Sequence, residues 1–165
     1  MSSQLSNELY CNEDYTAPAW LAEAVSKDVI PAKKVRLGRF PTPYHQWRIP
    51  AADSKGLEMW VKRDDLSSFD LGGNKVRKLQ FLLSEALTQK ADTTVTIGAA
   101  QSNHCRATAV ASRQLGMEPY LILRTRGEMD KDISSSLVGN LLWDKMVGAS
   151  IRTVTSAKYH EFGQY

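Results

Sequence analysis

Alternating strand-like and helix-like segments predict an α/β fold built on a parallel sheet. The sequence predicts strands near 58–63, 93–97, 120–124 and 150–154, and helices near 75–89, 104–115 and 136–147. Gly116 and Gly148 each follow a helical pattern and precede a strand, as glycine often does where a helix ends. Strands that alternate with helices in this order form parallel sheets with right-handed crossovers.

The segment before the first of these strands gives weaker signals. Residues 1–14 are polar and are expected to be loosely held. Residues 15–27 are expected to form a short helix with Pro18 in its first turn, where a missing backbone N–H costs nothing. The chain has 165 residues, of which 42% are hydrophobic, so it is long enough to bury one ordinary core.

Composition excludes several classes of protein. The net charge of +3 is mild and no basic patch alternates with aromatic residues, so nucleic acid is not an expected partner. No apolar run is long enough to span a membrane, so no membrane partner is expected. Cys11 and Cys105 are too few for a disulfide framework, and the first residues lack a signal-peptide core. A cytoplasmic protein without a bound metal is therefore expected.

A lysine stands next to a glycine turn where a helix is expected to begin. Gly72 and Gly73 precede Asn74 and Lys75, and the apolar spacing of a helix follows. The positive end of the helix dipole and the nearby basic side chains disfavour the ammonium form, leaving the amine that can attack an aldehyde. Lys75 is thus a candidate to carry pyridoxal phosphate. From these residues alone, a solvated basic first turn is an equal alternative.

A second motif follows the strand predicted at 93–97. Gly98 ends that strand, and Gln101, Ser102, Asn103 and His104 open the next helix. Ser102 and Asn103 are residue types that cap helices, and the free N–H groups behind them can bind an anion such as a substrate carboxylate. An ordinary capped helix after a buried strand is the alternative interpretation.

Together the two motifs resemble a known family. The segments KRDDLSSFDLGGNKVRKLQFLLSEAL and TIGAAQSNHCRATAVASRQLGMEPYLILRT are similar to the D-cysteine desulfhydrase and 1-aminocyclopropane-1-carboxylate deaminase family. These are pyridoxal-phosphate enzymes of the tryptophan-synthase-β fold, also called fold type II. The likeness runs from about Val35 to Val154, and the upstream LGRFPTPYHQW fits it.

The resemblance implies roles for individual residues. Lys75 matches the lysine that forms the Schiff base with the cofactor and then moves the Cα proton. Asn74 matches a residue beside it in the cofactor pocket, and Asn103 matches the asparagine that hydrogen-bonds the phenolic oxygen of pyridoxal phosphate. Ser102 matches a catalytic serine beside the substrate. The resemblance also implies that Gln101, Ser102, Asn103 and His104 bind the substrate carboxylate.

The implied activity is that of a lyase. It eliminates sulfide from D-cysteine, a small amino-acid substrate, to give pyruvate, ammonia and hydrogen sulfide. His104 and Cys105 stand where desulfhydrase-like members more often carry His-Cys, which favours sulfur elimination over deamination of 1-aminocyclopropane-1-carboxylate. The deaminase activity is the enzymatic alternative.

The resemblance also implies a division into domains. Residues 1–77 correspond to the N-terminal part of the larger domain with the Schiff-base lysine, and residues 78–165 to most of the smaller α/β domain. The C-terminal part of the larger domain would be absent, as in a C-terminally truncated member of a family whose full-length form is a homodimer. A non-catalytic short isoform, inert or paired with full-length subunits, is therefore a further alternative.

The sequence gives weaker support to the other candidate functional residues. Lys78 lies one turn after Lys75 and is an alternative Schiff-base lysine, although the family register favours Lys75. Asp64 and Asp65 are expected to serve structure, one exposed and one orienting a neighbour. His104 is either an acid or base near the cofactor ring or a simple first-turn residue. Cys105 is expected to pack inside its helix.

Overall fold

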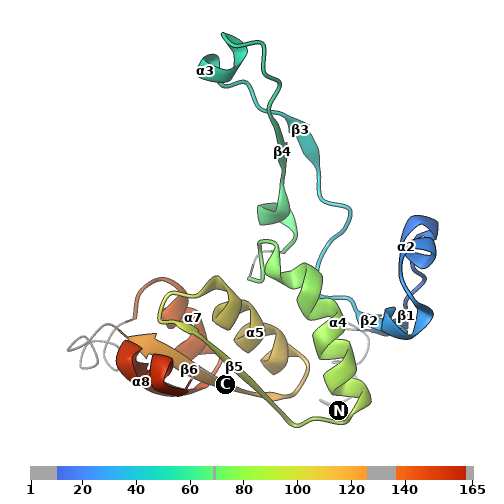
Figure 1. Cartoon of the computed structure of the whole chain (residues 1–165). Coiled ribbons are helices and arrows are strands. Elements are labelled where there is room, and N and C mark those ends of the chain that lie inside the picture. The colour runs from blue at the N-terminus through green and yellow to red at the C-terminus, as the bar shows by residue number, and fades with distance from the viewer. Residues whose placement is uncertain (1–10, 69, 126–136, 163–165) are drawn as a thin grey trace.

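The computed structural model describes residues 11–68, 70–125 and 137–162. Its elements in chain order are β1 (Asn12–Asp14), α2 (Ala19–Ala24), η1 (Lys27–Val29), β2 (Lys33–Val35), β3 (Tyr44–Gln46), α3 (Pro50–Asp53), β4 (Trp60–Lys62), η2 (Asp64–Leu66), α4 (Lys75–Thr88), β5 (Thr93–Ala99), α5 (Asn103–Gln114), β6 (Glu118–Thr125), α7 (Gly139–Met146), β7 (Ser150–Thr155) and α8 (Ser156–Phe162). The elements η1 and η2 are single 3-10 turns. Figure 1 shows a layered body from which one narrow arm extends.

The body contains the parallel sheet that the sequence predicts. Its strands lie in the order β5-β6-β7, and both neighbouring pairs are parallel. Ile97, Ile122 and Arg152 lie side by side across the three strands. Helices α5 and α7 occupy the connections between these strands, so the predicted α/β alternation is confirmed for this part of the chain.

One face of the sheet is covered by α5 and α7. Leu121 and Leu123 of β6 are fully buried against Cys105 and Ala109 of α5 and Leu141 of α7. The small α5 side chains let the helix approach the sheet closely. On the opposite face, Val95 is 64% exposed and Ile97 is 43% exposed. Parallel sheets are usually covered on both faces, so this one exposes more apolar surface than is typical.

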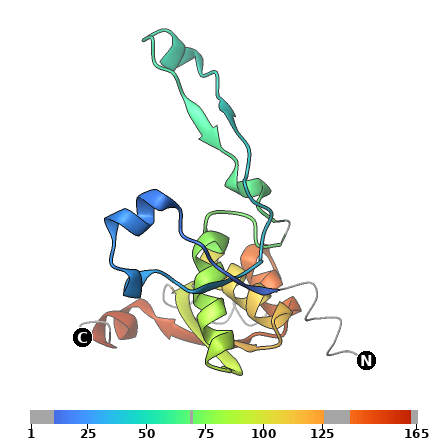
Figure 2. The same ribbon diagram turned by 90° about the vertical axis from the view of Figure 1, so that its right-hand side faces the viewer.

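A second cluster holds α4 against the rest of the body. Val76, Leu79 and Leu83 of α4 pack with Val35 of β2 and with Val110 of α5. Each of these side chains is at most 3% exposed. The helical spacing of apolar residues that predicts α4 therefore places a continuous stripe toward the core. Figures 1 and 2 show α4 running beside α5, which brings the N-termini of the two helices to the same side of the body.

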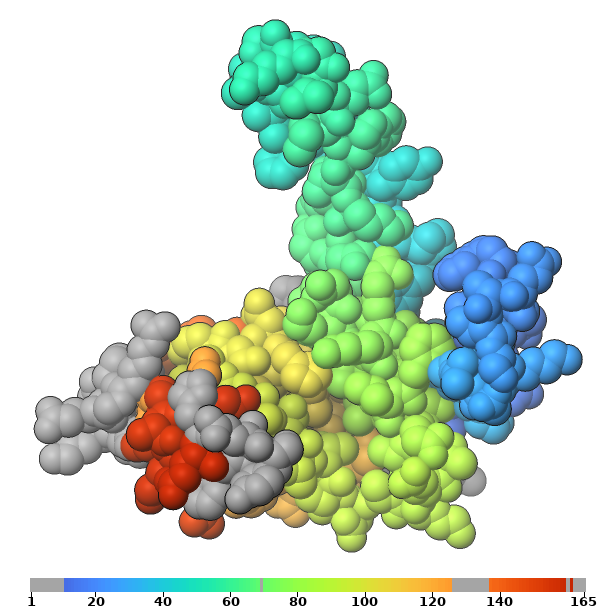
Figure 3. Space-filling view, in the orientation of Figure 1, coloured from blue at the N-terminus to red at the C-terminus, as the bar shows by residue number. Residues whose placement is uncertain are grey.

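The strand predicted at 58–63 does not belong to the parallel sheet. It is shorter, β4, and pairs antiparallel with β3 in a separate two-stranded ribbon. We call residues 44–62 the β3–β4 arm; it projects from the body with α3 at its tip (Figures 1 and 3). Alternation of apolar residues predicts a strand but does not identify its partner, and here the partner is the strand just before it in sequence.

Two expectations for the N-terminal segment are wrong in detail. Asn12–Asp14 form β1 and pair antiparallel with β2, whereas residues 1–10 lie outside the described part of the chain. Glu13 forms an ion pair with Arg36 at 2.8 Å, so opposite charges hold this end in place. The short helix covers only Ala19–Ala24, and Pro18 stands at the N-cap rather than in the first turn. Among the described residues, no helix is long and apolar enough to cross a membrane.

Candidate active site

Lys75 is the first residue of α4, directly after the glycine turn. Gly73 has a φ of +119°, which L side chains rarely adopt. A Cβ on Gly72 would lie 2.7 Å from Ser68 O, so the turn can pass over η2 only with glycine there. Asn74 is the N-cap residue, and its side chain Oδ1 accepts a hydrogen bond from Lys75 Nζ at 3.0 Å. The lysine side chain is half-buried.

The second predicted motif opens α5 as expected. Ser102 is the N-cap residue of α5, and its Oγ accepts a hydrogen bond from the Cys105 backbone N–H at 3.2 Å. A Cβ on Gly98 would approach Cys105 Sγ to 2.7 Å and Ser102 Oγ to 2.9 Å. The end of β5 can therefore meet the start of α5 only with glycine at this position. The buried Cys105 packs in its helix as predicted.

Arg106 connects the two motifs. From the first turns of α5 it donates hydrogen bonds to the backbone carbonyls of Asp70 and Gly72, the latter at 3.3 Å. Two turns later, Gln114 Nε2 donates to Asp70 Oδ2 at 2.5 Å. Arg106 and Gln114 share one side of α5, since eight residues correspond to about two helical turns. The glycine turn before Lys75 is thus fixed to the helix that begins at Asn103.

His104 lies between these two helix starts. Burial lowers its pKa below 6.5, and the charges of Lys78 and then Lys75 lower it further. Its Nδ1 is buried, and none of the described residues hydrogen-bonds it. Burial and the two lysine charges therefore favour the neutral form of the imidazole.

Gln101 and Asn103 are joined to the start of α7 through Asn140. The Asn140 side-chain amide donates to Gln101 O at 2.9 Å and to Asn103 Oδ1 at 2.8 Å. The loop and α7 are far apart in sequence, so no local sequence pattern points to Asn140, and the same holds for Arg106. A polar residue directly after Gly139 in an otherwise apolar helix start is the only signal the sequence offers for Asn140.

Asp64 binds the start of α4 through Arg77, whereas Asp65 is exposed, as expected for this pair. Asp64 accepts hydrogen bonds from Arg77 Nε and Nη2, both at 2.7 Å, and from Thr42 Oγ1 at 2.8 Å. The Arg77 guanidinium and the Thr42 hydroxyl lower the pKa of Asp64 to about 2. Asp65 instead pairs with Arg63 at 2.7 Å near the surface. Both aspartates lie in η2 rather than on a strand.

The Asp64→Asn variant is expected to be less stable at neutral pH by about 1–2 kcal/mol, because it loses a charged hydrogen-bond pair with Arg77. The folded pKa of Asp64 lies below its usual 3.8, so its contribution is present above pH 4 and is lost as the pH falls toward 2. Urea unfolding of both proteins at a series of pH values measures this. In contrast, Asp65→Asn should change little, and equal losses in both variants would contradict the assignment.

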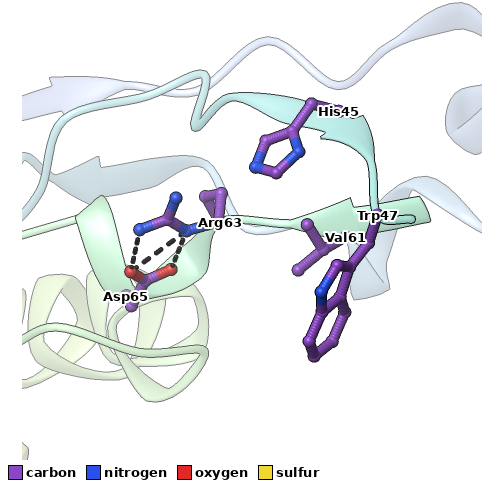
Figure 4. Close-up of a pocket in the computed structure, with 5 residues that line it drawn as sticks. All are labelled: His45, Trp47, Val61, Arg63 and Asp65. Atoms are coloured by element: carbon purple, nitrogen blue, oxygen red, sulfur yellow. Dashed lines mark hydrogen bonds and ion pairs between the residues drawn. The ribbon is translucent and has the colours of Figure 1, made fainter. Parts of the chain in front are cut away.

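The β3–β4 arm carries a separate pocket of about 380 Å³. It is lined by His45, Trp47, Val61, Arg63 and Asp65, as Figure 4 shows. Arg63 and Asp65 are tied to each other there, and the Trp47 ring stands at the other end (Figure 4). None of the predicted site residues lines this pocket. Among the described residues, no three His, Cys, Asp or Glu side chains are grouped so that they could hold a metal ion.

The sequence profile of the family described as "Pyridoxal-phosphate dependent enzyme" matches residues 35–164. The chain belongs to this family. The match includes the glycine turn, Lys75 and the whole Gln101–His104 loop. Pyridoxal phosphate is the cofactor on which the family depends.

Individual relatives of this chain carry two activity names. An Arabidopsis thaliana protein named bifunctional D-cysteine desulfhydrase/1-aminocyclopropane-1-carboxylate deaminase, mitochondrial, is 44% identical over 149 residues, which are 90% of this chain and 36% of that protein. A Yersinia enterocolitica D-cysteine desulfhydrase is 51% identical over 72 residues, 44% of this chain and 22% of that protein. A solved structure described as an ACC deaminase homologue matches with a TM-score of 0.64 and 34% identity over 82% of this chain and 39% of its own. The chain thus spans little more than a third of these relatives at most.

The residues present fit the cofactor. A primary amine at Lys75 and the amide of Asn103 begin neighbouring helices, and the buried Nδ1 of His104 has no partner among the described residues. Nothing lies within 4 Å of a Cβ placed on Gly73, so the backbone there is open to a flat ligand. Amine, amide and imidazole are groups that can bind the aldehyde and the ring oxygen of pyridoxal phosphate.

Proposed function

We propose that this chain is the lysine-bearing part of a pyridoxal-phosphate-dependent lyase that eliminates sulfide from D-cysteine. The observation that carries the proposal is the position of Lys75, at a glycine turn that Arg106 fixes to the start of α5. The names of the Arabidopsis and Yersinia relatives support the choice of D-cysteine.

In this proposal each predicted residue has a role. Lys75 binds the cofactor aldehyde and later moves the Cα proton of the substrate. Asn74, which already hydrogen-bonds Lys75 Nζ, holds the amine beside the cofactor. Asn103 donates a hydrogen bond to the phenolic oxygen of the cofactor. Ser102 is a catalytic neighbour of the substrate.

The loop that begins α5 binds the substrate carboxylate in the same proposal. Gln101, Ser102, Asn103 and His104 surround the first free N–H groups of the helix, where the helix dipole favours an anion. Bound pyridoxal phosphate withdraws electrons from Cα and so makes its proton acidic. D-cysteine and water then give pyruvate, ammonia and hydrogen sulfide, with no oxidant or reductant required.

The deaminase is the second candidate. A Pyrococcus abyssi relative named putative 1-aminocyclopropane-1-carboxylate deaminase is 48% identical over 97 residues, 59% of this chain and 27% of that protein. Hydrogen sulfide released from D-cysteine would support the desulfhydrase. Ammonia and ketobutyrate released from 1-aminocyclopropane-1-carboxylate would support the deaminase. If the chain releases neither product but changes the activity of a full-length relative on mixing, it acts instead as a non-catalytic isoform.

We also propose that residues 1–77 belong to the larger domain of the family fold and residues 78–165 to the smaller one. The proposed boundary falls inside α4, whose buried stripe packs with β2 on one side and α5 on the other. A homodimer and a cytoplasmic location complete the proposal. The Arabidopsis relative is named as mitochondrial, so cell fractionation decides the location.

A further inference from the structure

Four hydrogen bonds attach the Gln101–Asn103 loop to the start of α7. Gln101 Nε2 donates to Val138 O at 3.2 Å, and Gln101 Oε1 accepts from the Asn140 backbone N–H at 2.8 Å. The Asn140 side chain donates from Nδ2 to Gln101 O at 2.9 Å and to Asn103 Oδ1 at 2.8 Å. Asn140 is half-buried, whereas Gln101 and Asn103 are exposed. The loop that begins α5 is therefore held by a helix that begins 36 residues after it ends.

Backbone groups fix the direction of every amide in this network. Gln101 O can only accept, so the Asn140 atom that faces it must be the NH₂ group. The same NH₂ group faces Asn103, so the Asn103 atom opposite it must be Oδ1. The N–H groups of Asn103 are then turned away from Asn140 and remain available as donors. Reversing the Asn103 amide would place two NH₂ groups against each other.

Gly139 provides an independent sign that this contact is built in. Its φ is +58°, in the left-handed region that glycine tolerates best. A Cβ at this position would overlap Gln101 Oε1. Only glycine at position 139 leaves room for the Gln101 side-chain amide beside the start of α7. Gly139 and Asn140 together therefore accommodate Gln101.

We propose, on the basis of the function proposed above, that Asn140 is a positioning residue that acts through Asn103. It binds Asn103 Oδ1 and so presents the Asn103 N–H groups to the phenolic oxygen of the cofactor. That oxygen is an acceptor and carries negative charge, so a donor stabilises it and an acceptor repels it. Asn140 touches neither cofactor nor substrate in this arrangement.

The orientation of Asn103 can be tested without the cofactor. In the full chain labelled with nitrogen-15, the side-chain N–H protons of Asn140 should exchange slowly with water and those of Asn103 rapidly. The isosteric Asn140→Asp variant loses the hydrogen bond to Gln101 O. Asn103 should turn its N–H groups toward the new carboxylate, and its protons should become protected. Asn140→Ala should leave the Asn103 protons unprotected. Met146→Ala, at the exposed far end of α7, is the matched control and should leave both signals unchanged.

The consequence for the cofactor is tested by pH titration of the visible absorption of bound pyridoxal phosphate. In Asn140→Asp the Asn103 oxygen faces the anionic oxygen of the cofactor. This should raise the midpoint pH of the absorption titration by about one unit, which is a tenfold change in the proton affinity of the bound cofactor. Met146→Ala should keep the wild-type midpoint. A circular dichroism spectrum like that of the wild type shows that each variant is folded.

Two results would overturn the inference. The first is rapid exchange of the Asn140 side-chain protons in the folded wild type, because the network would then be absent. The second is an unshifted midpoint in an Asn140→Asp protein whose Asn103 protons have become protected. A wild-type chain that takes up no pyridoxal phosphate overturns the proposed function instead, and the exchange measurement alone then supports or overturns the control of Asn103 by Asn140.

Discussion

Replacing Lys75 by alanine is expected to abolish the visible absorption that the chain acquires with pyridoxal phosphate. The variant keeps Asn74, Asn103 and the glycine turn but loses the amine that binds the cofactor aldehyde. Any lyase activity of the chain should fall by about 10³-fold or more, since the same amine is proposed to move the substrate proton. The absorption spectrum after removal of free cofactor measures the first effect, and hydrogen sulfide release measures the second.

Lys78→Ala is the matched control for this prediction. Lys78 lies one turn further along α4 and is exposed, and both lysines lower the pKa of His104. Its replacement should leave the absorption in place while allowing the pKa of His104 to rise. If the absorption persists in Lys75→Ala and disappears in Lys78→Ala, Lys78 is the lysine that binds the cofactor. Absorption that persists in both variants would place the cofactor elsewhere.

The sequence predicts the body of the fold well because local patterns determine it. Each strand and helix from β5 to β7 shows one clear spacing of apolar residues, and glycines mark the helix ends. The β3–β4 arm was not predicted, because the segment at 58–63 has the same strand-like composition whether it pairs with a sheet strand or with its neighbour. The antiparallel pairing of β1 was also missed, since it depends on charge pairs such as Glu13 with Arg36 that are 23 residues apart.

For the candidate site, the sequence predicts the helix starts but not the residues that hold them together. Glycine turns and N-cap residues are local signals, and they correctly place Lys75 first in α4 and Ser102 at the N-cap of α5. The side chains of Arg106 and Asn140 donate hydrogen bonds to backbone carbonyls 34 to 39 residues away in sequence. No periodicity records such contacts, because either side chain would also suit a solvated helix face.

A buried acid near this site leads to the second large effect. Replacing Asp144 by asparagine is expected to raise the free energy of unfolding at pH 7.5 by about 1–3 kcal/mol. Asp144 of α7 is completely buried, and none of the described residues hydrogen-bonds either carboxylate oxygen. Burial raises its pKa to about 6, although the charge of Arg106 opposes this. Above that pH the folded protein must hold a buried charge to which no described residue donates a hydrogen bond, and the neutral amide avoids this cost.

The pH dependence identifies the residue. The folded pKa of about 6 exceeds the ordinary 3.8, so the folded state binds the proton more tightly, and the cost of Asp144 disappears as the pH falls from about 6 to 4. The difference between wild type and Asp144→Asn should therefore shrink over this range. Of the titratable groups nearby, the buried Cys105 thiol stays neutral because its pKa is raised. Because the pKa of His104 is lowered, its titration decreases the stability as the pH falls below 6.5. This decrease occurs in both proteins and so cancels in the difference between them.

Urea unfolding of both proteins between pH 4 and 8 measures this difference, with the exposed Asp92→Asn as control. A constant difference across the range would show that the carboxyl is not titrating, and the gain would then come from packing alone. Arg106→Met supplies a second check, since Arg106 both lowers the pKa of Asp144 and holds the glycine turn. Without the Arg106 charge the pKa of Asp144 should rise further, and ionising the buried carboxyl should cost more. Asp144→Asn should therefore stabilise the Arg106→Met protein more than it stabilises the wild type. The guanidinium group of Arg106 then couples the buried Asp144 of α7 to the glycine turn before Lys75.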